Sequence, residues 1–157
     1  VSGVTDDALF YEVVDLRSSA GLGGSIDADT VLWWLGKSDN ARGEIINSEK
    51  AIELPDALLG LSSFVSEFCG EQVQVWGNGS SFDNVILRSA YENCGITPFW
   101  KHWNDRDVRT IVELGRNAGI DPKKDFPFVG EAHNALDDAL HQVNYVVAIH
   151  QHLLKNL

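Results

Sequence analysis

The chain has 157 residues, of which 44% are hydrophobic, and a formal net charge of −11. This length and apolar content suit one domain that buries a hydrophobic core. The charge excludes a long basic groove for nucleic acid, because such grooves neutralise phosphates with Lys and Arg. An acidic chain can still act on phosphates where bound divalent cations supply the positive charge, and its footprint on a substrate should then be short.

The apolar runs and the cysteines indicate where the protein works. No apolar run approaches the roughly 20 residues that cross a bilayer, so no membrane partner is expected. Cys69 and Cys94 both fall in helical patterns near helix ends. A reduced pair in a cytosolic protein explains them better than a disulfide does. We therefore expect a cytoplasmic protein.

The first third of the chain predicts one strand and then helices. Residues 8–16 alternate and contain valines and aromatic residues, which favours a strand that ends before the glycine-rich stretch 21–24. Two short helices that form a hairpin should follow, with capping side chains before each: Asp29 before 30–35, and Ser38 or Asp39 before 41–46.

A longer helix is predicted after Pro55, which suits a first helical position. Apolar residues then recur at helical spacing from Leu58 to Phe68, and Gly70 ends the pattern. This spacing predicts a helix that packs its apolar stripe against the core.

The middle of the chain predicts a strand, a tight turn and a helix. Residues 72–76 alternate as a half-buried strand, and the turn Gly77-Asn78-Gly79 permits positive backbone torsion angles. Ser80 or Ser81 can cap a helix over residues 85–91, which closes at Gly95. Asp83 is therefore expected in the first turn of a helix.

Two further helices complete the predicted order. Residues 105–117 and 132–154 have helical patterns, with an irregular loop over 120–130 between them. The alternation of strands and helices predicts an α/β fold in which helices cover a mixed sheet, in one domain over 1–157.

His133 and Asp138 are the first candidates for chemistry, because a histidine before a helix and a carboxylate in its first turn can face the same cleft. Apolar residues recur along one side of this helix, and Asp138 lies well away from that stripe. An ordinary structural explanation is that Asp137 and Asp138 stabilise the helix dipole, which the spacing alone slightly favours.

Asp83 has the same ordinary explanation, with Asn84 and Ser81 as capping residues. Together, however, two first-turn carboxylates and a histidine are the groups that phosphodiester hydrolysis needs: carboxylates to hold divalent ions and a base to deprotonate water. Oxygen ligands favour Mg²⁺ or Mn²⁺ over zinc. Asn84 and Asn134, beside these residues, are candidates for substrate binding.

Three segments resemble the DEDDh 3'-5' exonucleases, most closely the bacterial and phage exoribonucleases and exodeoxyribonuclease VIII-like proteins: residues 76–87, 104–110 and 132–139. Residues 29–35 also match, so the resemblance extends from about Gly24 to the C-terminus. It implies an RNase H-like fold and a site for two metal ions. It also implies that Asp83 and Asp138 are metal ligands and that His133 is the base acting on water.

The chain departs from this family at the first motif, an Asp-x-Glu on the first central strand that supplies two of four metal-binding carboxylates. Asp15-Leu16-Arg17 is the nearest match, and it has arginine in place of glutamate. We interpret residues 1–4 as the remnant of the second strand. The first strand is expected to be absent from this chain, which makes the domain N-terminally incomplete.

Other residues have mainly structural explanations. Asp107 and Arg109 are expected to pair and anchor their helix, and the five tryptophans to lie mostly in the core rather than on bases. His141, near Asp138, is a weaker candidate for a supporting role. Lys123 and Lys124 form the one adjacent basic pair, which suits a solvated loop better than a phosphate contact.

Three hypotheses follow from the sequence. The first is a metal-dependent 3'-5' exonuclease that releases nucleoside monophosphates from a single-stranded end, RNA slightly favoured over DNA. The second is a catalytically inactive, nuclease-like module that binds nucleic acid or protein, motivated by the missing Asp-x-Glu. The third is a structural subunit whose paired tryptophans face a partner. The sequence leaves the oligomeric state open, homo-oligomers included.

Overall fold

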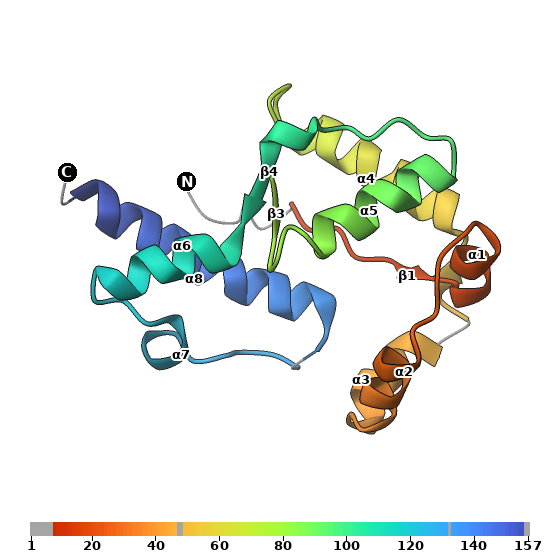
Figure 1. Ribbon diagram of the computed structural model, residues 1–157, viewed down its shortest axis with the longest axis horizontal. Helices are drawn as coiled ribbons and strands as arrows, with labels where there is room; N and C mark the ends of the chain where they lie inside the picture. The colour runs from red at the N-terminus through yellow and green to blue at the C-terminus, as the bar shows by residue number, and fades with distance from the viewer. Residues whose placement is uncertain (1–7, 47–48, 132, 156–157) are drawn as a thin grey trace. The chain divides into compact units, whose positions relative to one another are not determined.

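The computed structural model describes residues 8–46, 49–131 and 133–155 (Figure 1). The helices are α1 (Leu16–Gly21), α2 (Ala28–Leu35), α3 (Asp39–Ile46), α4 (Leu54–Phe68), α5 (Asp83–Asn93), the 3-10 helix η1 (His102–Asn104), α6 (Val108–Asn117), α7 (Pro122–Asp125) and α8 (Ala135–Lys155). The strands are β1 (Val13–Val14), β2 (Ala51–Ile52), β3 (Val75–Gly77) and β4 (Asp105–Asp107). The predicted α/β class is confirmed.

The described strands pair in two small parallel sheets. β1 pairs with β2, and β3 pairs with β4 with Val75 opposite Asp105 and Gly77 opposite Asp107. The prediction of one mixed sheet is therefore wrong for the residues that the structure describes. The strands are short because helix caps follow them directly: Asp15 accepts a hydrogen bond from the Ser18 N–H after β1, and Asp107 caps α6.

The chain divides into two compact units. Among described residues, the first contains 8–9, 74–85, 102–131 and 133–155, and the second contains 10–46, 49–73 and 86–101. We call them the α6–α8 unit and the α4 unit. All the site residues predicted from the sequence other than the missing first motif lie in the α6–α8 unit. A single domain over the whole chain stays a prediction.

The core of the α4 unit lies under α4. Leu58 and Val65 on this helix are buried, as the predicted stripe requires, whereas Phe68 at its end is exposed. Tyr91 is fully buried and its hydroxyl donates to the Leu58 carbonyl at 2.9 Å. Its ring lies edge-on to Trp100, with ring centroids 5.9 Å apart. These contacts hold the second half of α5 against α4.

The core of the α6–α8 unit lies between the two helices that name it, which lie alongside each other (Figure 1). Val108 from α6 packs with Tyr145, Val146 and Ile149 from α8. A Cβ atom at Gly115 would lie 2.7 Å from Ile149 Cδ1, so the two helices approach each other closely only because residue 115 has no side chain. The buried residues of α8 are Tyr145, Val146 and Ile149, so this helix packs one side against the core, as its apolar spacing predicts.

Several element boundaries differ from the prediction. The strand predicted over 8–16 is reduced to β1, because α1 begins at Leu16. The helix predicted over 105–117 is a strand followed by α6, and the loop predicted over 120–130 contains α7. Asp27 rather than Asp29 caps α2, through the Thr30 N–H at 2.8 Å.

Other predictions are confirmed or lie outside the described residues. Ser38 Oγ accepts from the Ala41 N–H, as expected of a cap, and both cysteines are free thiols. Residues 1–4, interpreted as a strand remnant, lie outside the described residues. Within the described ranges no helix combines the length and apolarity needed to span a membrane.

Candidate active site

The loop between β3 and α5 positions Asp83. The Gly79 carbonyl accepts the N–H groups of Phe82 and Asp83, at 2.8 and 3.1 Å, which turns the chain into α5. Gly79 has φ +112, and a Cβ atom at Gly77 would lie 2.4 Å from Asn84 Oδ1, so both positions need glycine. Asp83 is the first residue of α5 and is exposed, as predicted.

Asn84 fastens the start of α5 to both strands of the β3–β4 sheet. Its side chain is only 2% exposed, and Nδ2 donates to the Val75 carbonyl and to Asp105 Oδ1, each at 3.0 Å. This amide nitrogen is engaged within the protein, a structural role that the sequence did not reveal. Substrate contact by Asn84 stays a prediction.

Asp107 links β4, α6 and the loop that leads to Asp83. Its carboxylate accepts from the Arg109 N–H at 2.7 Å and from the Ser80 N–H at 2.6 Å. The expected anchoring of α6 is therefore present, although it uses the backbone of Arg109 and not its guanidinium. Hydrogen bonds from Ser80 and then Arg109 lower the pKa of Asp107 below its ordinary value.

We expect Asp107→Ala to lower the free energy of unfolding by about 1 kcal/mol at neutral pH, the usual cost of losing a helix cap. Because the pKa of Asp107 is lowered on folding from 3.8, its stabilisation is present above about pH 4 and is lost as pH falls through the folded value. Urea unfolding of wild type and variant between pH 7 and pH 3 should therefore converge in acid. Glu113→Ala, on the same helix, is the control, and a pH-independent difference would contradict the assignment.

His133 precedes α8 in an unusual backbone conformation. Its φ is 73°, and it is the one non-glycine residue with positive φ among those that the structure describes. Such strain costs about 1–3 kcal/mol and is common at functional sites. The His133 side chain is exposed. The positive φ of His133, directly before α8, is therefore a feature that functional residues often have.

The neighbours of His133 hold this entry loop from both sides. Asn134 Oδ1 accepts from the N–H groups of Leu136 and Asp137, so Asn134 caps α8. Asp137 Oδ2 accepts from the Glu131 N–H at 2.8 Å. Asn134 as a substrate-binding residue stays a prediction, because capping uses its oxygen and says nothing of its nitrogen.

Asp138 differs from Asp137 in its surroundings. It lies half-buried in the first turn of α8, and no hydrogen bond to its carboxylate is formed by the described part of the chain. The carboxylate of Asp83, which is exposed, likewise accepts no hydrogen bond from the described residues. Burial and then the charge of Asp138 raise the pKa of Tyr145, so the Asp138 carboxylate acts on the face of α8 that bears Tyr145.

No set of three His, Cys, Asp or Glu side chains placed to hold a metal ion together is found within residues 8–46, 49–131 and 133–155. Asp83 and Asp138 lie in the same unit, each in the first turn of its helix. Both predicted ligands therefore lie in first helical turns. Among the described residues, neither belongs to a group of three or more side chains that could hold a metal ion.

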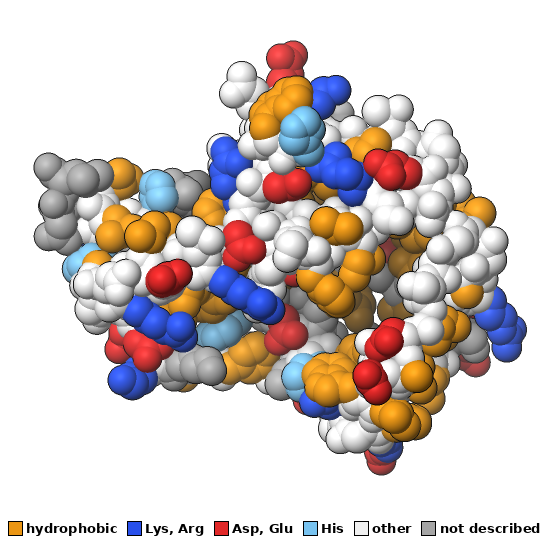
Figure 2. Space-filling model, viewed as in Figure 1, with side chains coloured by type: hydrophobic (Ala, Val, Ile, Leu, Met, Phe, Trp, Pro, Cys, Tyr) orange, Lys and Arg blue, Asp and Glu red, His pale blue; other side chains and the backbone are white. Residues whose placement is uncertain are grey.

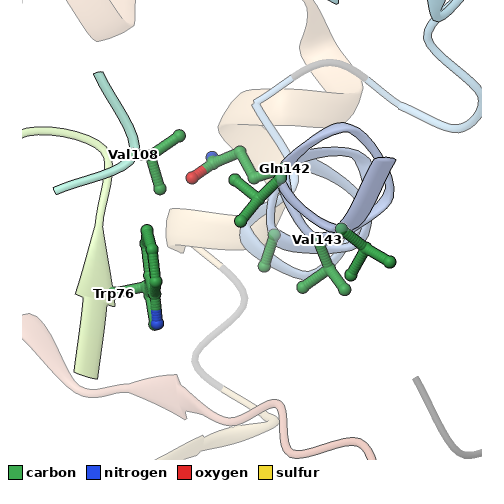
Figure 3. A pocket seen from close by; sticks show the side chains of 7 residues that line it. Trp76, Val108, Gln142 and Val143 are labelled. Carbon is green, nitrogen blue, oxygen red and sulfur yellow. The ribbon is translucent and has the colours of Figure 1, made fainter. Parts of the chain in front are cut away.

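Two of the cavities formed by described residues of the α6–α8 unit bear on the site. One, of about 180 Å³, separates Trp76 on β3 from α8: Trp76 and Val108 lie on one side and Gln142 and Val143 on the other (Figure 3). Val143, Val146 and Val147, from the apolar side of α8, also line this cavity. Trp100 is buried as predicted, but Trp33, Trp76 and Trp103 are exposed, so the expectation that the tryptophans lie mostly in the core is wrong.

The second cavity, of about 420 Å³, has a mixed lining that carries charged side chains, and it was not predicted. Its lining includes Asn78 from the loop before Asp83, Arg109 and Arg116 from α6, and His141 and Tyr145 from α8. On the face shown in Figure 2, basic side chains and a histidine lie over α6 and α8 with acidic side chains among them. The sequence signal for it was the spacing of Arg109, Val112 and Arg116, which puts them on one face of a helix.

The helices and short parallel strands form a mixed α/β structure that is compatible with an α/β nuclease fold. The chain belongs to a 3'-5' exonuclease family: the model of the 3'-5' exoribonuclease Rv2179c-like domain matches residues 3–150. No curated protein and no solved structure matched significantly. The family match bears out the predicted 3'-5' exonuclease family.

Proposed function

We propose that the protein is a metal-dependent 3'-5' exonuclease of RNase H-like fold that removes nucleoside monophosphates from single-stranded ends, with RNA favoured over DNA. Asp83 and Asp138 hold Mg²⁺ or Mn²⁺, and His133 is the general base. The family match carries this proposal. The strained backbone of His133 beside a first-turn carboxylate supports the assignment of roles.

The donor chemistry of Asp83 and Asp138 fits Mg²⁺. This ion takes oxygen ligands, usually keeps several waters, and is often bound through one or two carboxylates together with substrate phosphates. Asp83 is exposed and Asp138 half-buried, so solvent and a phosphate can approach both. When bound, the ion polarises phosphoryl oxygens and stabilises the charge that develops on them.

The residues of the chain perform the remaining steps. His133 takes a proton from the attacking water, whose oxygen forms the new bond to the phosphorus of the terminal phosphodiester. The bond from phosphorus to the 3' oxygen of the preceding nucleotide breaks, and that oxygen is protonated. The products are a nucleoside 5'-monophosphate and a strand shorter by one nucleotide with a 3' hydroxyl.

The test is the release of monophosphates from a 5'-labelled single-stranded RNA, resolved on a gel and by chromatography. We expect turnover with Mg²⁺ or Mn²⁺ and none with EDTA, and a loss of at least about 100-fold in Asp138→Asn, since the ligand's charge is removed. Glu92→Gln is the control with the same change in net charge. Turnover that persists in EDTA would contradict the proposal.

A catalytically inactive, nuclease-like binding module is the second candidate. The sequence contains no Asp-x-Glu in a suitable strand, and the described residues bring no third metal-binding side chain to Asp83 or Asp138. This candidate predicts that the wild-type chain binds single-stranded RNA without shortening it in Mg²⁺. The same labelled RNA distinguishes the two, since binding and turnover are measured on one probe.

A further inference from the structure

The arginine-lined cavity between α6 and α8 has no role in the chemistry proposed above. At about 420 Å³ it has the size of an ordinary small-molecule site. Two arginines and a histidine line it, in a chain with 12 Lys and Arg against 23 Asp and Glu. Basic groups that gather around one cavity of so acidic a protein indicate an anionic ligand.

We propose that this cavity binds a backbone phosphate of a nucleic-acid strand, through Arg109 and Arg116. The choice of a nucleic acid as the source of the phosphate rests on the proposed function. Arginine presents its donors in a planar fork that matches two phosphate oxygens, which makes it the residue best suited to this contact.

The helices place the two arginines on one wall. Arg109 and Arg116 are seven residues apart on α6, about two turns, so their side chains leave the same face of the helix with Val112 between them. His141 and Tyr145, one turn apart on α8, form the facing wall. The His141 ring lies edge-on to Phe128 and to Tyr145, at centroid distances of 5.0 and 5.2 Å, which fixes its position.

The Arg109 guanidinium is available for a ligand. It has no ion-pair partner in the described part of the chain, and its Cζ would lie 3.3 Å from a Cβ atom at Gly79. It therefore rests against the backbone of the loop that leads to Asp83. The N–H of Arg109, not the side chain, takes part in the cap of α6. Replacing the guanidinium should thus leave the helix intact.

The Arg116 guanidinium is held only weakly. Its Nε lies 3.4 Å from Asp121 Oδ1, and the Arg116 side chain is 48% exposed. An exposed pair of this kind contributes little to stability, so a phosphate can compete for the guanidinium. The Asp121 carboxylate also lies 3.8 Å from Lys124 Nζ and keeps that cation near when Arg116 turns to a ligand.

The lining of the cavity includes one residue linked to each of the two proposed metal ligands. Asn78 in its lining begins the loop that ends at Asp83, and Tyr145 in its lining has its pKa raised in part by Asp138. A strand whose 3' end lies at Asp83 and Asp138 would therefore pass this cavity with a phosphate on the 5' side of the scissile bond. A contact there adds affinity without touching the reacting atoms.

The test is binding of a fluorescent single-stranded oligoribonucleotide, by anisotropy in EDTA so that no turnover occurs. We expect Arg109→Gln and Arg116→Gln each to weaken binding about tenfold, since each loses hydrogen bonds to a charged group. The slope of log K against log salt concentration should fall by about 0.7 for each arginine, as expected when one phosphate contact to a single strand is lost. Lys155→Gln, at the end of α8, removes the same charge and should bind like wild type.

Two arms complete the design. Inorganic phosphate, adenosine monophosphate and the unlabelled oligonucleotide are added as competitors. Displacement of the labelled strand from wild type, together with weakened strand binding in both arginine variants, supports the proposal. Competition by phosphate with unchanged strand binding in both variants would assign the cavity to free phosphate and overturn it. Thermal unfolding checks that the variants fold, and Arg109→Lys, which keeps the charge but not the fork, should lie between wild type and Arg109→Gln.

Failure of this inference is distinct from failure of the proposed function. Weakened strand binding in the arginine variants, with no turnover in Mg²⁺ for wild type, would reject the exonuclease and keep the phosphate site. Normal turnover with an unchanged KM in both arginine variants would keep the exonuclease and reject the phosphate site. A wild-type protein that binds no oligonucleotide rejects the site outright.

Discussion

His133→Ala should reduce the rate of RNA shortening by about 10²- to 10⁴-fold, the usual contribution of a general base. The loss should appear in kcat rather than in KM, because the imidazole is proposed to act on the attacking water and not to bind the strand. Initial rates in Mg²⁺ on the labelled RNA measure it. His102→Ala, in the exposed η1 helix, removes a histidine elsewhere in the same unit and should keep the wild-type rate.

His133→Gly separates the imidazole from the backbone that carries it. Glycine adopts the φ of 73° without a steric penalty, so this variant should be at least as stable as wild type and yet as slow as His133→Ala. Thermal unfolding and the same rate assay give both quantities. A His133→Gly protein that keeps its rate would show that the strained backbone, and not the imidazole, is what the site requires.

Asn84→Asp should give the largest loss of stability, about 3 kcal/mol or more. The buried amide nitrogen donates to the Val75 carbonyl and to the Asp105 carboxylate, and a carboxylate in its place would face two acceptors with no proton to offer. The variant loses the two hydrogen bonds that connect the start of α5 to the β3–β4 sheet. Urea unfolding at neutral pH measures the difference.

A second substitution distinguishes this explanation from a general intolerance of change at residue 84. Asp105→Asn in the Asn84→Asp background restores a donor and an acceptor across the same contact and removes the like charge, so it should recover about half of the lost free energy. No recovery would mean that the Val75 contact dominates. If Asn84→Asp unfolds at the same urea concentration as wild type but binds RNA more weakly, the substrate-binding prediction for Asn84 gains support.

The helices were largely predictable because their signals are local. Ser38 and Pro55 mark helix starts as expected, and the apolar spacing of α4 is that of a helix packed on one side. The strands were less predictable, because each has only two or three residues, too few to show an alternation of apolar and polar side chains. Nothing local in Asp105-Arg106-Asp107 favours a strand: these residues extend because β3 lies beside them and Asn84 binds Asp105. Pairing of this kind depends on residues some thirty positions away in the sequence.

The candidate site shows the same division. First-turn positions for Asp83 and Asp138 follow from caps and spacing, and the structure confirms both positions. The positive φ of His133 could not be read from the sequence, since the loop is shaped by Asn134 and Asp137 binding backbone N–H groups. The arginine-lined cavity depends on how α6 and α8 pack against each other, which the local sequence pattern of neither helix predicts.

Gly115 gives that packing a wider meaning. A methyl group there would meet the fully buried Ile149, so the spacing of the two helices is set by the smallest side chain available. The next residue along the chain is Arg116, on the wall of the arginine-lined cavity. A side chain at residue 115 would push α6 away from α8, and the wall that carries Arg116 would move with α6. A position that touches no ligand therefore contributes to the width of the cavity.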